Sequence, residues 1–193
     1  MPGATATYGT RTMKMPALRY LPILFALVIA PASTAHGANP NTRAASDTER
    51  SELAGGWHFV RIHNPSGGAD AISIMHTADT SKSDLDLAGL TIRCGETNAE
   101  VIVVLLRTFP LRARPQVIFG DSGSEIKFEA TVAPPGTAVL LPKDAMHLVS
   151  GSWLTMSNLL IRVDDGKTTI RGVVALVGLH EALKVLLASC FTQ

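Results

Sequence analysis

Two cysteines constrain this chain more than any other feature of its sequence. Cys190 ends the run from Gly178, in which apolar residues recur at the three-and-four spacing of one helix face. Cys94 ends an earlier apolar run, Leu87–Cys94, which is typical of a strand. Cysteines in even number usually pair in an exported domain, so we predict a Cys94–Cys190 disulfide that holds a C-terminal helix on a sheet. The alternative is two buried free thiols.

The N-terminal residues indicate an export signal. A positively charged lead precedes the apolar core at 21–30, and small residues ending at Ala35 or Ala38 follow this core. The core is about half the roughly 20 residues that a membrane span needs, which favours cleavage over anchoring. We therefore predict a signal peptide over residues 1–35, with Met13 as an alternative start, and a periplasmic location.

Removing this signal peptide changes the formal net charge from +1 to −2, because it takes three basic residues with it. A protein that binds phosphates along a backbone needs a basic surplus, so we expect neither nucleic acid nor an anionic lipid surface as a partner. The apolar run at 100–109 is interrupted by Arg107 and rich in β-branched residues, which favours a buried strand. We expect no transmembrane span in the mature chain.

The rest of the chain predicts one mainly β (α+β) domain over residues 55–193, preceded by a flexible polar segment at 36–54. Short β-rich runs alternate with turn clusters, which is typical of an antiparallel β-sandwich-like domain, here with the C-terminal helix packed on it. The expected strands are 57–63, 71–76, 87–94, 100–109, 116–119, 125–132, 137–141, 159–163 and 169–176, with a short helix inside 143–154. Asp165-Gly166 gives the strongest hairpin signal.

No motif supports a reaction. The GDSG at 120–123 resembles the nucleophile of trypsin-like proteases, but no histidine stands in that family's sequence context and too little chain precedes Ser122 for the barrel. We expect a turn there and a protein that is not an enzyme, with a hydrolase using Ser122 or a His-containing cleft as the alternative. His58, His63 and His76 lack further ligands at suitable spacing, so we expect no metal and no cofactor, with a metal- or ligand-binding protein as a second alternative.

The two tryptophans differ in their surroundings. Trp57 shares a strand face with Phe59, which favours the core. Trp153 follows Gly151-Ser152 in the least regular part of the chain, which makes it a candidate interaction surface, with a core anchor as the alternative.

The strand Leu90-Thr91-Ile92-Arg93-Cys94 and the helix from Gly178-Leu179 to Cys190 resemble a known pairing. Over Leu87–Cys190 the chain is similar to the VasI/TagO-like periplasmic proteins associated with type VI secretion, which join an L-x-I-x-C strand to a final helix ending in cysteine. The resemblance implies no catalytic residues. It implies a non-enzymatic exported envelope protein, an interaction or secretion-associated accessory module with an envelope protein as partner.

Overall fold

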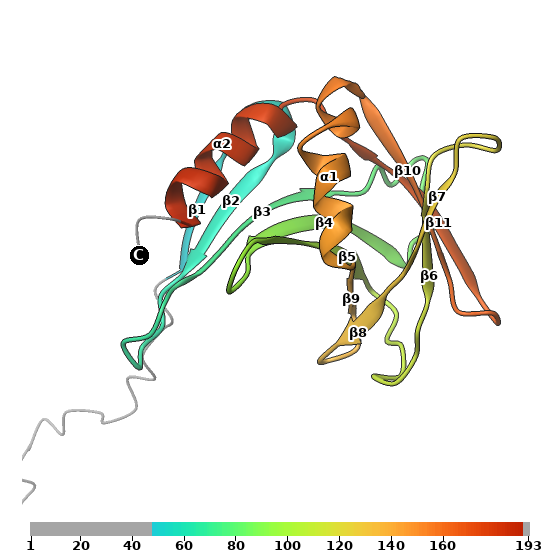
Figure 1. Cartoon of the computed structure of the whole chain (residues 1–193), viewed down its shortest axis with the longest axis horizontal. Helices are drawn as coiled ribbons and strands as arrows, with labels where there is room; N and C mark the ends of the chain where they lie inside the picture. Colours follow the sequence, from blue (N-terminus) through green and yellow to red (C-terminus); the bar gives the residue numbers. More distant parts are fainter. Residues whose placement is uncertain (1–47, 191–193) are drawn as a thin grey trace, which may run out of the picture. The chain divides into compact units, whose positions relative to one another are not determined.

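A computed structural model describes residues 48–190 as two antiparallel sheets and a C-terminal helix (Figure 1). The predicted signal peptide and its cleavage site lie outside these residues. The seven-stranded sheet contains, in pairing order, β1 (Thr48–Glu52), β2 (His58–Ile62), β3 (Ala71–Thr77), β4 (Leu87–Cys94), β5 (Ala99–Leu105), β9 (Ala138–Leu140) and β8 (Thr131–Ala133). The four-stranded sheet contains β11 (Thr169–Ala175), β10 (Asn158–Asp164), β6 (Gln116–Phe119) and β7 (Ile126–Glu129).

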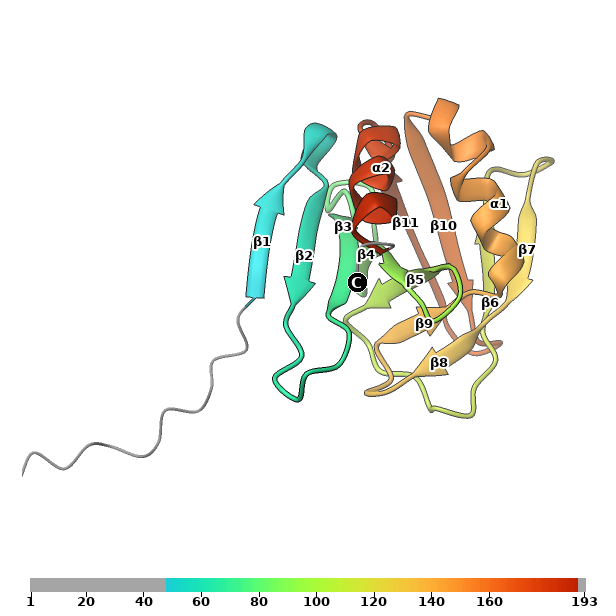
Figure 2. The ribbon, with the colours of Figure 1, turned by 60° about the vertical axis from the view of Figure 1, so that its left-hand side comes forward.

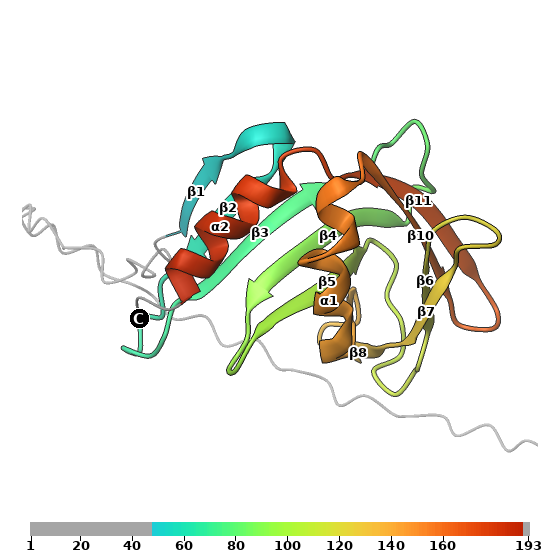
Figure 3. The same cartoon turned by 45° about the horizontal axis from the view of Figure 1, so that its top comes forward.

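Short helical segments and one longer C-terminal helix connect these sheets or pack on them. They are η1 (Ala54–Gly56), η2 (Lys143–Ala145), α1 (Met146–Val149), η3 (Ser152–Thr155) and α2 (Leu179–Cys190). Helix α2 lies over β2, β3 and β4 (Figures 2 and 3). The predicted fold class is therefore confirmed: the domain is mainly β, antiparallel, with the C-terminal helix packed on a sheet.

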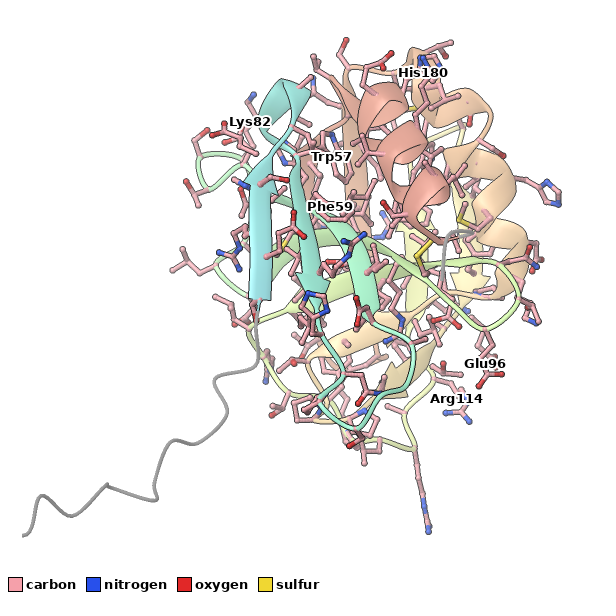
Figure 4. All side chains as sticks on the ribbon, turned by 90° about the vertical axis from the view of Figure 1, so that its left-hand side faces the viewer. Trp57, Phe59, Lys82, Glu96, Arg114 and His180 are labelled. Atoms are coloured by element: carbon pink, nitrogen blue, oxygen red, sulfur yellow. A yellow bond between two sulfur atoms is a disulfide. The ribbon has the colours of Figure 1, made fainter. Side chains whose placement is uncertain are left out.

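The period-two pattern of the strands explains which face each sheet buries. Ile72 and Ile74 of β3 and Ile92 of β4 point into one core, while the residues between them point outward. Leu183 and Leu186 of α2 enter the same core. Figure 4 shows Trp57 and Phe59 on the side of β2 that faces α2, and both are buried, as predicted for Trp57.

A loop closes the edge of the four-stranded sheet. The Ser83 hydroxyl accepts the Val173 backbone N–H at 2.9 Å, and the Asp84 carboxylate accepts the Arg171 backbone N–H at 2.7 Å. In return, the N–H groups of Asp79 and Asp84 donate to the carbonyls of Val173 and Arg171 at 2.8 Å each. These bonds satisfy backbone groups of β11 that an edge strand otherwise leaves open to another chain.

The N-terminal limit of the domain differs from the prediction. The segment 36–54 was expected to be flexible, which is wrong for Thr48–Glu52, because these residues form β1 and pair with β2 from Thr48↔Ile62 to Glu52↔His58. All five residues of β1 are exposed. The strand pairs with β2 through its backbone, and Glu49 lies 3.6 Å from Arg61 of β2, but no apolar pattern predicts the strand.

The expected strand 125–132 is two strands. β7 belongs to the four-stranded sheet and β8 to the seven-stranded sheet, and Ala130 lies between them with 1% of its surface exposed. The Ala130 N–H donates to the Pro115 carbonyl at 2.9 Å instead of to a ladder partner. Ala130 and Val132 are both buried, so the alternation runs through the bend and hides it from sequence analysis.

Helix α2 is held at both ends. At its C-terminus, Cys190 is bonded to Cys94 at the end of β4, with the two Cα atoms 5.6 Å apart. At its N-terminus, Gly178 has a φ of 82° and Gly55 of η1 a φ of 72°. A Cβ on Gly178 would overlap the Ala54 carbonyl, and one on Gly55 would overlap the Val177 carbonyl. The two backbones therefore pack directly against each other.

We predict that Cys94→Ser and Cys190→Ser lower the free energy of unfolding by similar amounts, about 2–5 kcal/mol each, because the bond restricts the unfolded chain. The double variant should lose hardly more than either single variant, since one interaction is removed in all three. Urea denaturation of the unreduced proteins measures this. Additive losses would show that the cysteines act separately.

The β10–β11 hairpin gives a second prediction. Asp165 accepts the N–H groups of Thr168 at 2.7 Å and Lys167 at 2.9 Å, and these hydrogen bonds lower the pKa of its carboxyl. A carboxyl with a lowered folded-state pKa stabilises the fold above its unfolded pKa, and this contribution disappears as the pH falls through the folded-state pKa. Asp165→Ala should therefore destabilise the protein at pH 7 and make little difference near pH 2. A constant difference across this range would contradict the assignment.

Candidate functional site

Trp153 is not a surface residue. The prediction of an interaction surface there is wrong, because the side chain is 2% exposed and lies in the core. Its ring meets that of Phe119 edge-on, with the centroids 5.0 Å apart. The 3₁₀ turn η3 places Trp153 inward, while Ser152 and Thr155 of the same turn are exposed, and one inward residue in so short a turn leaves no periodic signal.

Ser122 lies in an exposed turn between β6 and β7. The Ser124 N–H donates to the Asp121 carbonyl at 2.9 Å, which closes the turn. The histidines contact other groups: His63 Nδ1 lies 3.0 Å from an Asp70 carboxylate oxygen, and the His76 ring nitrogens contact the carbonyls of Thr77 and Gly55 at 2.8 and 3.0 Å. The structure therefore does not bring Ser122 together with these two histidines.

Metal-binding residues are not grouped in the described part of the chain. Between residues 48 and 190, no three side chains of His, Cys, Asp or Glu lie close enough to hold an ion. Over the same residues, no helix is long and apolar enough to cross a membrane.

A groove of about 900 Å³ crosses the face of the seven-stranded sheet that points away from α2; we call it the outer groove. The strand register builds it, because Ser73 lies opposite Arg93, Thr91 opposite Ile102, and Val104 opposite Ala138. Its further lining includes Ile62 and Asp70 near β2, the β4–β5 loop, Lys143, and both bonded cysteines, Cys94 and Cys190. Figure 4 shows Glu96 in this loop.

The polar side chains of the outer groove are held in place. The Arg93 guanidinium donates to one Glu100 carboxylate oxygen from Nη2 at 2.7 Å and from Nε at 2.8 Å. The Lys143 ammonium contacts the Thr97 hydroxyl at 3.4 Å. Val104 supplies apolar surface beside these groups, and Ile102 lies buried beneath them. Hydroxyls, one ion pair and aliphatic side chains suit non-covalent recognition of a polypeptide.

A second groove, of about 390 Å³, lies on the outer face of the four-stranded sheet; we call it the arginine groove. Arg162 and Arg171 line it from β10 and β11, and Ser122 lies at its margin. Sequence analysis missed both grooves, because their residues come together only through long-range strand pairing. The alternating polar positions of β4 and β10 were the available signal, but they do not reveal which strands become neighbours.

The fold defines a class of protein: an antiparallel two-sheet domain whose C-terminal helix is bonded to a strand. It is similar to the crystal structure of invasion associated protein B from Bartonella henselae, with 11% sequence identity and a TM-score of 0.46. This likeness covers 72% of the present chain and 96% of that chain. No family model and no curated protein matches the sequence. The resemblance to the VasI/TagO-like family stays a prediction.

We predict that Trp153→Ala destabilises the domain by about 3–5 kcal/mol, the usual cost of removing a buried aromatic side chain. Trp153→Phe keeps an aromatic ring beside Phe119 and should lose less. Thermal unfolding followed by circular dichroism measures both variants. A Trp153→Ala protein as stable as the wild type would contradict the burial of this side chain in the core.

Proposed function

We propose that the protein is a non-enzymatic module of the cell envelope, exported to the periplasm, that binds an envelope protein through the outer groove. The observation that carries this proposal is the outer groove itself, which has the disulfide in its lining. The bond between Cys94 and Cys190 supports export, because disulfides persist in oxidising compartments. The resemblance to the VasI/TagO-like proteins extends the proposal to an accessory role in secretion.

The dimensions of the outer groove favour an extended segment as its occupant. Its lining runs from Ile62 on β2 across β3, β4 and β5 to Ala138 on β9. Four spacings of about 4.8 Å between neighbouring strands give a length near 19 Å. An extended chain rises about 3.3 Å per residue, so roughly six residues of a partner fit across the sheet.

The polar groups of the groove suit such a segment. Thr91 and Ser73 offer hydroxyls that donate to or accept from a peptide backbone. Val104 and the exposed Ile62 offer contact to its apolar side chains. The Arg93–Glu100 pair is already formed, so binding needs little further ordering of these two long side chains.

A photoreactive residue introduced at Thr91 tests this proposal. Thr169, an exposed threonine on the four-stranded sheet, provides the matched control position. In periplasm, we expect Thr91 to form an adduct with one protein and Thr169 to form none. The adduct, identified by mass spectrometry, should form again with the purified partner. Ser73→Arg, which fills the groove, should abolish it.

Two results would contradict the proposal. Equal labelling from Thr91 and Thr169 would show that the outer groove has no specific partner. A covalent adduct of a fluorophosphonate probe at Ser122 would favour the hydrolase that sequence analysis left as an alternative. Ser122→Ala is the control for this labelling.

A further inference from the structure

Two arginines stand directly opposite each other on the four-stranded sheet. The register of β10 and β11 pairs Arg162 with Arg171, and both side chains point away from the core because Ile161, Val163 and Ile170 beside them are buried. Lys127 of β7 belongs to the same cross-strand row, since Ile118 of β6 pairs with both Arg162 and Lys127. Like charges in direct opposition destabilise a sheet. This row therefore needs negative charge from elsewhere.

The protein supplies only part of that charge. Glu125 lies 2.9 Å from Arg162 Nη2 and 3.3 Å from Lys127 Nζ, and hydrogen bonds from Lys127 and Arg162 lower the pKa of its carboxyl. Lys82, which also lines the groove, is paired with Asp79 at 3.1 Å. No such ion pair or side-chain hydrogen bond reaches the Arg171 guanidinium within residues 48–190; the nearby Asp84 carboxylate accepts its backbone N–H instead.

The groove beside Arg171 has an apolar floor. Leu160 and Val173 pair across β10 and β11, two register positions from the Arg162–Arg171 pair and therefore on the same face of the sheet. Leu160 is 39% exposed, although its neighbours along β10 on either side are buried. The groove volume, about 390 Å³, lies within the range of about 300–1,000 Å³ that small-molecule sites occupy.

We propose that the arginine groove binds an amphiphilic organic anion, in which a carboxylate or phosphate head binds Arg171 and an alkyl chain lies on Leu160 and Val173. The planar fork of a guanidinium matches both head groups. Lys82 and Arg162 add positive charge, but Asp79 and Glu125 pair with them, so Arg171 is the guanidinium of the groove left without an ion pair within residues 48–190. The Ser122 hydroxyl is a further donor at the margin.

The loop on β11 fixes this arrangement. Ser83 and Asp84 hold the loop to the strand through the backbone of Val173 and Arg171, which places Lys82 beside the groove. Gly172 permits the contact, because a Cβ there would overlap Ser83 and Leu87. The loop that carries Lys82 is thus a fixed part of the edge of the four-stranded sheet.

Titration with octyl phosphate, octanoate, octanol and inorganic phosphate, all below micelle formation, tests the proposal. Backbone amide NMR shifts at Arg171 and Val173 report occupancy and give Kd. We expect octyl phosphate or octanoate to bind at this site, and the stronger of the two identifies the head group. Octanol lacks the charge and inorganic phosphate lacks the chain, so both should bind at least about tenfold more weakly.

Variants assign the contacts. Arg171→Gln should raise Kd about tenfold or more, through loss of a charge-assisted contact, and Arg171→Lys should fall between it and the wild type. Arg112→Gln, which changes an exposed arginine in the β5–β6 loop, is the matched control and should leave Kd unchanged. Glu125→Gln should tighten binding, because it removes a competing carboxylate. Unchanged circular dichroism confirms that each variant is folded.

Three outcomes would overturn the inference. Octanol binding as well as octanoate would show that the charge has no part in recognition. If Arg112→Gln raised Kd as much as Arg171→Gln does, the binding would reflect a general attraction of anions to the protein. Binding of inorganic phosphate with the same Kd as octyl phosphate would show that Leu160 and Val173 contribute nothing to recognition. None of these outcomes bears on the outer groove, which lies on the other sheet.

Discussion

The bond between Cys94 and Cys190 joins the last residue of β4 to the last residue of α2 and so closes a loop that contains most of the domain. Every strand after β4 lies inside that loop, including the whole four-stranded sheet. The helix covers the core face of β2, β3 and β4, while the bonded cysteines also line the outer groove. One covalent contact thus joins the C-terminal end of the helix to β4 and also borders the outer groove.

The two proposed sites use the two sheets differently. The outer groove runs across five strands, and its charged side chains include Asp70, Glu96 and Lys143 as well as the Arg93–Glu100 ion pair. The arginine groove is smaller and leaves Arg171 without an opposite charge from the chain's own side chains within residues 48–190. The first surface offers an extended partner both charged and apolar contacts, and the second is the one proposed to hold a small anion. Binding at one therefore needs no change at the other.

Local patterns predicted much of the fold. They predicted the strands at 87–94 and 116–119, the Asp165-Gly166 hairpin and the cysteine pair. The strands and the hairpin follow from period-two burial and turn chemistry, which act over short stretches of chain. The disulfide follows from the even number of cysteines. β1 was missed because all five of its residues are exposed, which leaves the strand without an apolar pattern. The bend at Ala130 and the inward Trp153 were missed because each depends on distant contacts, as do both grooves.

The backbone contact between Gly55 and Gly178 has an evolutionary consequence. A core pair such as Leu183 and Ile74 can exchange volume, because one side chain can shrink when the other grows. The two glycines have no side chains to trade, and each already lies against the carbonyl of a residue next to the other. No second substitution can relieve a Cβ at either position without moving η1 away from α2. Pairs of compensating substitutions should therefore accumulate among the buried leucines of α2 and be absent at Gly178, immediately before the helix begins.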